Sequence, residues 1–424
     1  MSNEFEQNLD KYVDVILKIG LNLQEGQRLL IGLVNPINAG TPLELAPFVR
    51  KIVKKAYQMG AKFVEVMWND PQISLTRLEN APKDSFEEVP IWRMKGAVEY
   101  AKNGDAIFAI AAQDPKLFSG QDPKSLMTLN QAVSRSFMPI LELIVKNVSN
   151  WCLVAAPVNG WADSVFPSIT SNEGEKKLWD VIFEICRIKQ KDPVAAWNDH
   201  MSSLKARCEF LNKKQYDSIK IVGPETDLTI GLINNHIWMG GSSTSQNGIE
   251  FVPNVPTEEI FTTPDKNRTE GKVKGTKPLY RAGTIIEDFS FTFSNGKVVE
   301  INASKGKEIL EGLLNYDEGA KLLGEIALVP HSSPISRSEL LFFNTLIDEN
   351  ASIHLALGTA YKFNVKNGEN MSDEEFQKIG GNTSILHMDF MIGSEKVNVN
   401  GMLKDGSIEP IMKNGEWAFD VAPK

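Results

Sequence analysis

The first half of the chain is constrained most by apolar runs of strand length that alternate with helix-like stretches. The runs occupy residues 28–34, 62–68, 106–112 and 151–157. Apolar residues recur at helical spacing in the stretches 43–58, 125–146 and 175–187. A continuous apolar run has no polar face to turn toward water, so such a strand must be covered on both sides. The alternation therefore predicts an α/β domain with a parallel sheet between two layers of helices.

Parallel sheets of this kind often bind nucleotides, but the usual phosphate-binding motifs are missing here. No GxGxxG follows the first run, and no GxxxxGK[ST] occurs anywhere in the chain. The loop at 35–40 is instead typical of a turn. We therefore expect residues 1–195 to form a scaffold and substrate-gating domain, with nucleotide binding as the weaker alternative.

A long polar helix predicted at 195–213 marks the boundary between two domains. Beyond it, residues 218–222 and 228–233 are predicted strands around a turn, and an Asn-Gly pair between 289–293 and 298–301 is typical of a hairpin. Further strand-like segments lie at 388–392, 397–399 and 417–421. Residues 196–424 are therefore predicted to form a mixed α+β domain, largely antiparallel.

Composition and charge exclude several classes of protein. A formal net charge of −9 argues against binding to a phosphate backbone. The three cysteines Cys152, Cys186 and Cys208 are widely spaced and odd in number, which predicts buried thiols in a reducing compartment. No apolar run approaches the ~20 residues of a membrane span, and the N-terminus lacks the features of a signal peptide. We expect a soluble cytoplasmic protein that binds neither nucleic acid nor membrane.

The clearest local pattern for chemistry is a histidine and an aspartate two residues apart in the second half. His387 and Asp389 lie in an alternating segment, so both should project from one face of a strand. Together they can bind one divalent ion, or the carboxylate can orient the imidazole of a structural histidine. Local sequence leaves both interpretations open.

Three other segments contain candidate groups that each have an ordinary structural explanation. His354 lies in an apolar stretch and could be a buried structural histidine, and Tyr361 follows seven residues later. Glu258 and Glu259 lie in the proline-rich segment 247–264, which predicts an extended rigid loop, although two solvated acids at a helix start are also common. Glu325 precedes an apolar strand and could be an edge charge.

Taken together, these segments resemble one known family. The strings EFVPNVPTEEIFTTPDKNRTEG, GEIALVP, ENASIHLALGTAY and ILHMDFMIG are similar, in wording, order and spacing, to the thermophilic-type aminopeptidases of the M29 metallopeptidase family. The resemblance covers most of the chain and is strongest in the second half. It implies a homodimeric enzyme that acts on peptides with a free N-terminus.

The resemblance also implies a set of site residues. Family members hold two divalent metal ions in the C-terminal domain, and the corresponding ligands here are Glu259, Glu325, His354, His387 and Asp389. Glu325 would bridge the ions, Tyr361 would hydrogen-bond the developing oxyanion, and Glu349 or Glu259 would act as general base. Carboxylates and imidazoles without thiolates suit Zn²⁺, Co²⁺ or Mn²⁺, and a shared water would be the nucleophile.

Two other functions remain as alternatives. One is a different metal-dependent amidase or esterase, and the other is a non-catalytic peptide-binding protein on the same scaffold. The sequence contains no HExxH and no GxSxG, which disfavours a zincin and a serine hydrolase with a nucleophile elbow.

Overall fold

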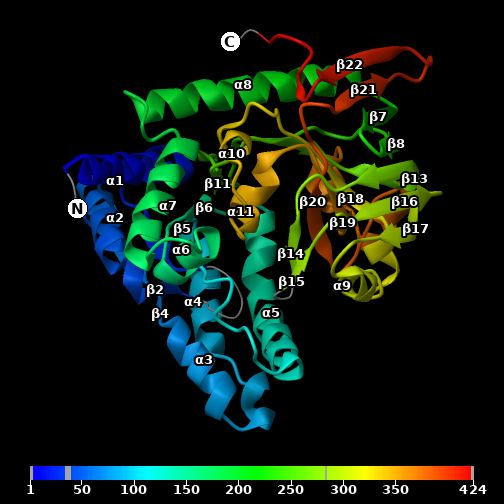
Figure 1. Ribbon diagram of the computed structural model, residues 1–424. Coiled ribbons are helices and arrows are strands. Elements are labelled where there is room, and N and C mark those ends of the chain that lie inside the picture. The colour runs from blue at the N-terminus through cyan, green and yellow to red at the C-terminus, as the bar shows by residue number, and fades with distance from the viewer. Residues whose placement is uncertain (1–2, 34–39, 282–283, 422–424) are drawn as a thin grey trace. The chain divides into compact units, whose positions relative to one another are not determined.

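The computed structural model describes residues 3–33, 40–281 and 284–421 (Figure 1). Contacts within the chain define two compact units. Unit 1 comprises Met1–Asp199 and Ser242–Pro256, and unit 2 comprises His200–Gly241 and Thr257–Lys424. The chain first passes from unit 1 to unit 2 within helix α8 (Pro193–Lys214), which confirms the helix predicted at 195–213.

Unit 1 is built around a parallel sheet with the strand order β11-β6-β5-β1-β3. The four apolar runs form β1 (Arg28–Ile31), β3 (Phe63–Val66), β5 (Ala106–Ala111) and β6 (Trp151–Ala155). The parallel sheet predicted from the alternation is therefore confirmed. The fifth strand, β11 (Asn254–Val255), comes from the proline-rich segment. The turn predicted at 35–40 lies almost wholly outside the described residues.

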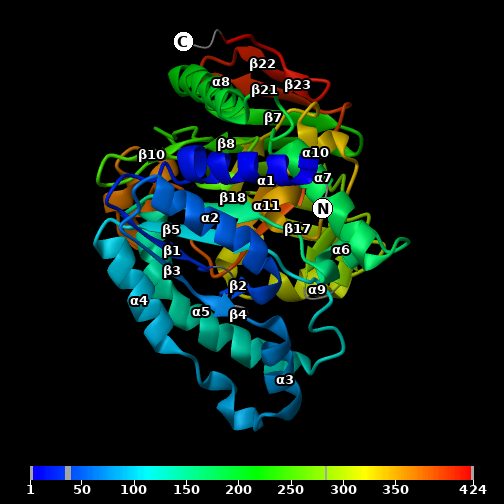
Figure 2. The same ribbon diagram turned by 90° about the vertical axis from the view of Figure 1, so that its left-hand side faces the viewer.

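Helices cover both faces of this sheet (Figure 2). On one face, α4 (Ile91–Lys102) and α5 (Pro123–Val145) pack with strand residues in a cluster that includes Leu30, Met94, Ala97, Ile107 and Ile140. On the other face lie α1 (Asn3–Val15), α2 (Ala46–Gln58) and α7 (Ser171–Ile185). The aromatic rings on these three helices pack together, with ring-centroid distances of 5.4 to 5.8 Å. The rings are those of Phe5, Tyr12, Phe48, Trp179 and Phe183.

Unit 2 contains an eight-stranded antiparallel sheet with the order β17-β16-β13-β8-β7-β21-β22-β23. The strands are β7 (Ser218–Gly223), β8 (Thr226–Leu232), β13 (Pro264–Lys274), β16 (Ser290–Ser294), β17 (Lys297–Asn302), β21 (Asn398–Met402), β22 (Ile408–Lys413) and β23 (Glu416–Trp417). The β16–β17 hairpin turns at Asn295 and Gly296, whose φ angles of 49° and 81° explain the Asn-Gly pair. The strand predicted at 417–421 is wrong, because β23 ends at Trp417.

A second, four-stranded antiparallel sheet in unit 2 has the order β12-β18-β19-β20 (Figure 1). Its strands are β12 (Ile260–Thr262), β18 (Leu323–Leu328), β19 (His354–Gly358) and β20 (His387–Met391). One face packs into the hydrophobic core, where Phe291 of β16 meets Phe390 at a ring-centroid distance of 5.1 Å. The core residues on this face are Ile326, Leu328, Leu355, Leu357, Met388 and Phe390. Since side chains alternate along a strand, the opposite face is left for polar groups.

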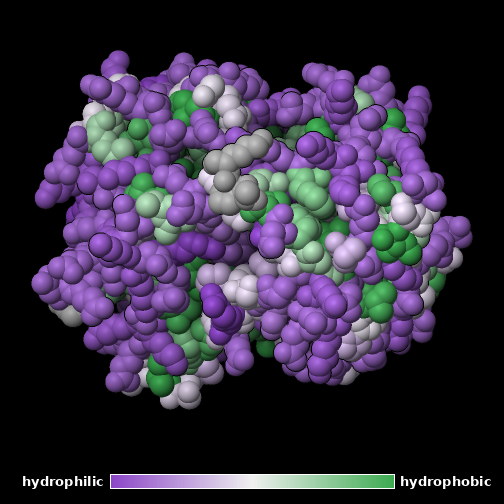
Figure 3. Space-filling view, turned by 90° about the horizontal axis from the view of Figure 1, so that it is seen from above, coloured by the Kyte–Doolittle hydropathy of each residue, from purple (hydrophilic) through white to green (hydrophobic). Residues whose placement is uncertain are grey.

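The remaining predictions concern cysteines and the surface. All three cysteines are free and buried, as predicted. Among the helices in the described part of the chain, none combines the length and the hydropathy that a bilayer crossing requires. On the face drawn in Figure 3, hydrophilic side chains predominate and hydrophobic ones gather in smaller patches.

Candidate metal centre

The polar face of the four-stranded sheet is assembled by strand register. Glu325 on β18 lies opposite Ala356 on β19, and Ala356 lies opposite Asp389 on β20. His354 and His387 are each two residues from a member of this row, so their side chains project on the same face. The residue between the two carboxylates is an alanine, whose side chain is a single methyl group.

Gly358, at the end of β19, permits the close approach of β20 beside His387. Its φ is 104°, and an added Cβ would lie 2.0 Å from the carbonyl oxygen of Leu386. A side chain at this position would therefore strain the backbone and collide with it. Small residues on β19 thus define the space and the strand spacing in which the polar groups meet.

Four short distances link the five predicted ligands into one chain. Nε2 of His354 lies 3.1 Å from Oε2 of Glu259 and 3.6 Å from Oε1 of Glu325. Nε2 of His387 lies 3.8 Å from the other oxygen, Oε2, of Glu325 and 3.2 Å from Oδ1 of Asp389. The two oxygens of the Glu325 carboxylate therefore face two different histidines.

Both imidazoles are oriented by backbone carbonyl groups. Nδ1 of His354 lies 3.1 Å from the carbonyl oxygen of Ser352, and Nδ1 of His387 lies 3.0 Å from that of Thr359. A carbonyl oxygen only accepts hydrogen bonds, so each Nδ1 carries a proton and each Nε2 faces the carboxylates, where it can bind a metal ion once it has lost its own proton. This arrangement is the usual support for a metal-binding histidine.

The residues present fit a divalent cation. One ligand atom each from Glu259, Glu325 and His354 lies within 4.8 Å of the others. Oε2 of Glu259 is buried, and Nε2 of His354 lies 3.1 Å from it. A buried carboxylate oxygen of this kind needs a compensating positive group. The donor set consists of carboxylates and imidazoles, which suit Zn²⁺, Co²⁺ or Mn²⁺. It contains no thiolate, which disfavours a closed structural zinc site.

The pKa values of the cluster residues also support a site for a divalent cation. Burial lowers the pKa of His387, but the carboxylates of Asp389 and Glu325 outweigh this effect and raise the pKa to about 10. Burial likewise opposes the charged form of His354, yet Glu259 and Glu325 raise its pKa well above the ordinary value. Burial raises the pKa of Glu325 despite its two histidine neighbours. Without an ion, the cluster therefore retains protons that a divalent cation would replace.

Glu349 and Tyr361, the two residues predicted to act in catalysis, lie beside the cluster. Glu349 begins a short 3₁₀ segment (Glu349–Ala351), and burial followed by the charges of Glu259 and Asp389 raises its pKa well above normal. The ring of Tyr361 lies 5.2 Å from that of His387 and is stacked on Phe363 at 5.0 Å. Burial and nearby carboxylates, Glu325 first among them, raise the pKa of the Tyr361 hydroxyl, so the phenol stays protonated.

The proline-rich segment differs from its prediction in two respects. It was expected to lack regular structure, but Ile260–Thr262 form the edge strand β12, and Glu259 immediately precedes that strand. Glu258 and Glu259 are 3% and 9% exposed, so they are not solvated acids at a helix start. Ala356 and Gly358 were not recognised as site residues, although small residues at alternate positions of an apolar strand are a readable signal.

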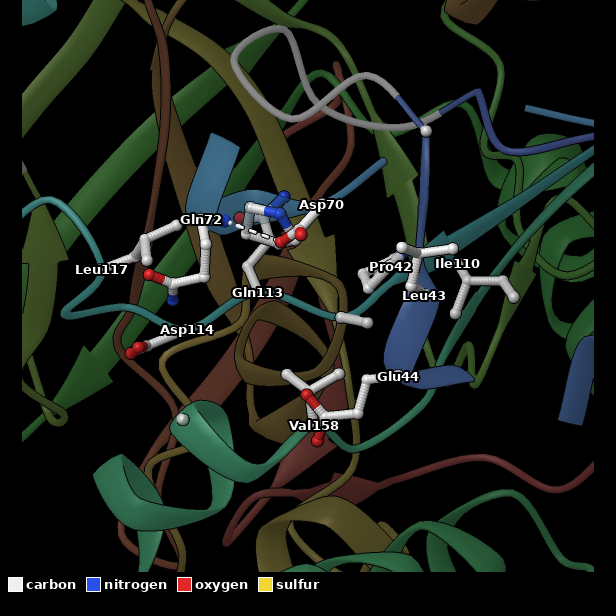
Figure 4. A pocket seen from close by; sticks show the side chains of 14 residues that line it. Pro42, Leu43, Glu44, Asp70, Gln72, Ile110, Gln113, Asp114, Leu117 and Val158 are labelled. Carbon is white, nitrogen blue, oxygen red and sulfur yellow. Dashed lines mark hydrogen bonds between the residues drawn. The ribbon is translucent and has the colours of Figure 1, made fainter. Parts of the chain in front are cut away.

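A separate hollow lies in unit 1, at the carboxyl ends of its parallel strands (Figure 4). Its lining includes the acids Glu44, Asp70 and Asp114, and none of the lining residues that the structure describes is basic. Each acid accepts a backbone N–H, from Asn159, Gln72 and Lys116 respectively, so the three carboxylates cap helices and turns. An acidic lining without basic groups disfavours the nucleotide-binding alternative.

A buried set of carboxylates and imidazoles on one sheet face is typical of a metal-dependent hydrolase. The chain belongs to the M29 family: the family described as thermophilic metalloprotease (M29) matches residues 5–417.

The chain is similar to several named relatives over nearly its whole length. It is 44% identical to Aminopeptidase 2 of Geobacillus stearothermophilus over 420 residues, which cover 99% of this chain and 100% of the relative. It is 41% identical to Aminopeptidase T of Thermus aquaticus, covering 98% and 99%. The solved structure of wild-type AmpT from Thermus thermophilus matches with a TM-score of 0.91 at 38% identity, over 98% of this chain and 100% of that one. The two-unit fold is therefore that of AmpT.

Proposed function

We propose that this metallopeptidase is an aminopeptidase that releases N-terminal amino acids from peptides, using a water molecule activated between two divalent metal ions. The family membership and the aminopeptidase names of the relatives support the activity. The observation that carries the two-ion proposal is the Glu325 carboxylate, whose oxygens face His354 and His387 separately.

The cluster can be divided into two half-sites that share this carboxylate. Glu259, His354 and Oε1 of Glu325 would hold one ion, and His387, Asp389 and Oε2 of Glu325 would hold the other. Bound there, two divalent ions supply Lewis acidity: they lower the pKa of a water and polarise the scissile carbonyl. Zn²⁺, Co²⁺ and Mn²⁺ all suit these ligands.

The remaining site residues would move and hold protons. Burial, followed by the charges of Glu259 and Asp389, raises the pKa of Glu349, so its carboxylate would readily take up a proton from the attacking water. Glu259 is the alternative general base. Tyr361 keeps its hydroxyl proton and can donate a hydrogen bond to the oxygen on which charge develops.

Three further proposals concern the whole protein. We place catalysis in the C-terminal domain, residues 196–424, and assign scaffolding and substrate gating to residues 1–195. We also propose, from the family resemblance, a homodimer that works in the cytoplasm on peptides with a free N-terminus. Light scattering of the purified protein would test the dimer, which a monomer mass would refute.

The central experiment combines metal analysis with hydrolysis of matched substrates. The purified chain is assayed on leucine p-nitroanilide and on its N-acetyl derivative, before and after chelation and again after divalent ions are restored. We expect hydrolysis of the free-amine substrate alone, loss of activity on chelation, and two ions per chain. Equal cleavage of both substrates would favour the amidase alternative, and metal binding without hydrolysis would favour a peptide-binding protein.

A pair of variants ties the activity to the site. Glu325→Gln should lower activity on the order of 100-fold or more, because it removes the charge shared by the half-sites. Glu318→Gln is the control: this acid has an 87% exposed side chain beside Lys297 and lies outside the cluster. Full activity in the Glu325→Gln protein would refute the assignment of the site.

A further inference from the structure

A fully buried asparagine links the two segments that carry Glu259 and Glu349. Asn350 is 0% exposed, and its Oδ1 accepts a hydrogen bond of 2.7 Å from the backbone N–H of Glu258. The two bonded residues are 92 positions apart in sequence. Each is the immediate neighbour of a site acid, since Glu258 precedes Glu259 and Asn350 follows Glu349.

Both ends of the Asn350 amide are used, so its orientation is fixed. Nδ2 donates to the carbonyl oxygen of Leu346, 3.2 Å away in helix α11 (Thr345–Asp348). If the amide turned over, an N–H would face the N–H of Glu258 and an oxygen would face a carbonyl. Asp348 fixes the same helix by accepting backbone N–H groups from Phe342 at 2.8 Å and Asn344 at 2.9 Å. The amide therefore connects the Glu258–Glu259 backbone to a firmly held element.

The hydrogen bond between Glu258 and Asn350 holds the chain next to Glu259, where no strand pairing among the described residues does so. The ladder between β12 and β18 begins at Ile260, so Glu259 lies just before the paired residues. Glu349 lies close enough to Glu259 for the two carboxyl groups to interact electrostatically, so the spacing of their two segments matters to the site. The hydrogen bond from the N–H of Glu258 to Oδ1 of Asn350 fixes that spacing at a position that β-sheet pairing does not reach.

We propose that Asn350 is a positioning residue of the metal centre, which holds the Glu259 backbone in register with the Glu349 segment. The roles of Glu259 and Glu349 in this inference rest on the function proposed above. Loss of the Asn350 side chain would free the Glu259 backbone and leave the buried N–H of Glu258 without its acceptor. The effect should therefore fall on ion affinity and on turnover, and not on substrate binding.

The test compares Asn350→Ala with a matched variant in unit 1. Asn150 is also 0% exposed and also uses both ends of its amide, donating 2.7 Å to the carbonyl oxygen of Leu21 and accepting 2.6 Å from Gln27. Asn150→Ala thus removes an equally buried clamp outside the cluster. Asn350→Asp keeps an oxygen for the Glu258 N–H and, as the protonated acid that burial favours, an O–H that can donate to the Leu346 carbonyl; it serves as the conservative variant, including the case in which Asn350→Ala does not fold.

The readouts are Co²⁺ affinity by competition with a chelator, the visible spectrum of the Co²⁺ protein, thermal midpoint, and kcat and KM at saturating ion. We expect Asn350→Ala to weaken Co²⁺ binding and to lower kcat by about 10- to 100-fold at nearly constant KM, as for other residues that support metal ligands. We expect Asn350→Asp to recover most of the Co²⁺ affinity and most of kcat. We expect Asn150→Ala to lower only the thermal midpoint.

Two results would overturn the inference. One is an Asn350→Ala protein with wild-type Co²⁺ affinity and spectrum. The other is a loss of affinity that Asn150→Ala reproduces at equal thermal destabilisation, or that Asn350→Asp does not relieve. Because affinity and spectrum need no substrate, these results remain interpretable if the wild-type chain is not an aminopeptidase. A wild-type chain that binds Co²⁺ but hydrolyses nothing would refute the proposed function alone.

Discussion

Metal binding should release protons from the two site histidines, and the amount can be worked out from the structure. The ion-free cluster raises the pKa of His387 to about 10, so this imidazole is protonated at pH 7. A metal ligand must be neutral, and removing the proton at pH 7 costs about three pH units, or ~4 kcal/mol. The raised pKa of His354 adds a second proton that must leave.

The sign of the pH dependence follows from these two raised pKa values. Protons compete with the ion, so apparent affinity should rise with pH and level off as pH passes about 10 for His387. Each displaced proton contributes about a tenfold change in affinity per pH unit, and two protons contribute about 100-fold. Between pH 6 and 8 the binding curve should therefore shift steeply.

Calorimetric titration at pH 7 measures the number of protons directly. Binding is followed in buffers of different ionisation enthalpy, and the slope of observed enthalpy against that quantity gives the protons released. We expect about two for the wild-type chain, one fewer for His387→Gln, and no change for His331→Gln, which alters a histidine bonded to Ser336 outside the cluster. Enthalpies that do not depend on the buffer would refute the reasoning.

Three other substitutions probe particular contacts. Ala356→Val should reduce bound ions and activity at least tenfold by filling the space between Glu325 and Asp389, at a folding cost of about 1–3 kcal/mol; unchanged metal content on analysis would count against the placement of the ions. Gly358→Ala should lower the thermal midpoint by more than a surface change, since its Cβ would lie 2.0 Å from a carbonyl oxygen at a φ of 104°; a midpoint equal to that of wild type would contradict this geometry. Burial raises the pKa of Asp348 from 3.8 to about 6, so its contribution to stability is full below pH 3.8 and lost as pH rises through 6, by ~3 kcal/mol. Urea unfolding from pH 4 to 7 should show that Asp348→Asn removes this part of the pH dependence, and identical slopes for the two proteins would contradict it.

Where sequence reasoning succeeded, a simple periodicity determined the structure. The continuous apolar run at 106–112 predicts a strand that is buried on both faces, and β5 is such a strand. Alternation placed Leu386, Met388 and Phe390 together, and all three lie in the core while His387 and Asp389 face the other way. Both results need only the geometry of one strand.

Where it did not succeed, the missing information was a contact between distant segments. Nothing in the neighbourhood of Glu325 predicts that its two oxygens would face His354 and His387, because that depends on the register of β18, β19 and β20. Local rules also missed β12 (Ile260–Thr262), since the prolines before it suggested no strand and its pairing partner lies more than 60 residues away. The family resemblance supplied the joint assignment that periodicity could not.

The chain crosses between its two compact units three times, and this path has a consequence for biosynthesis. The sheet of unit 1 acquires its last strand, β11, from residues 254 and 255, after unit 2 has already begun at His200. A ribosome that has released only the first 199 residues has therefore exposed β6 as an unpaired edge, which is a site for association with other nascent chains. Completion of the first unit must wait for Ser242–Pro256, which ends three residues before Glu259. The stretch of polypeptide that finishes the scaffold thus leads directly into the first acid of the proposed metal centre.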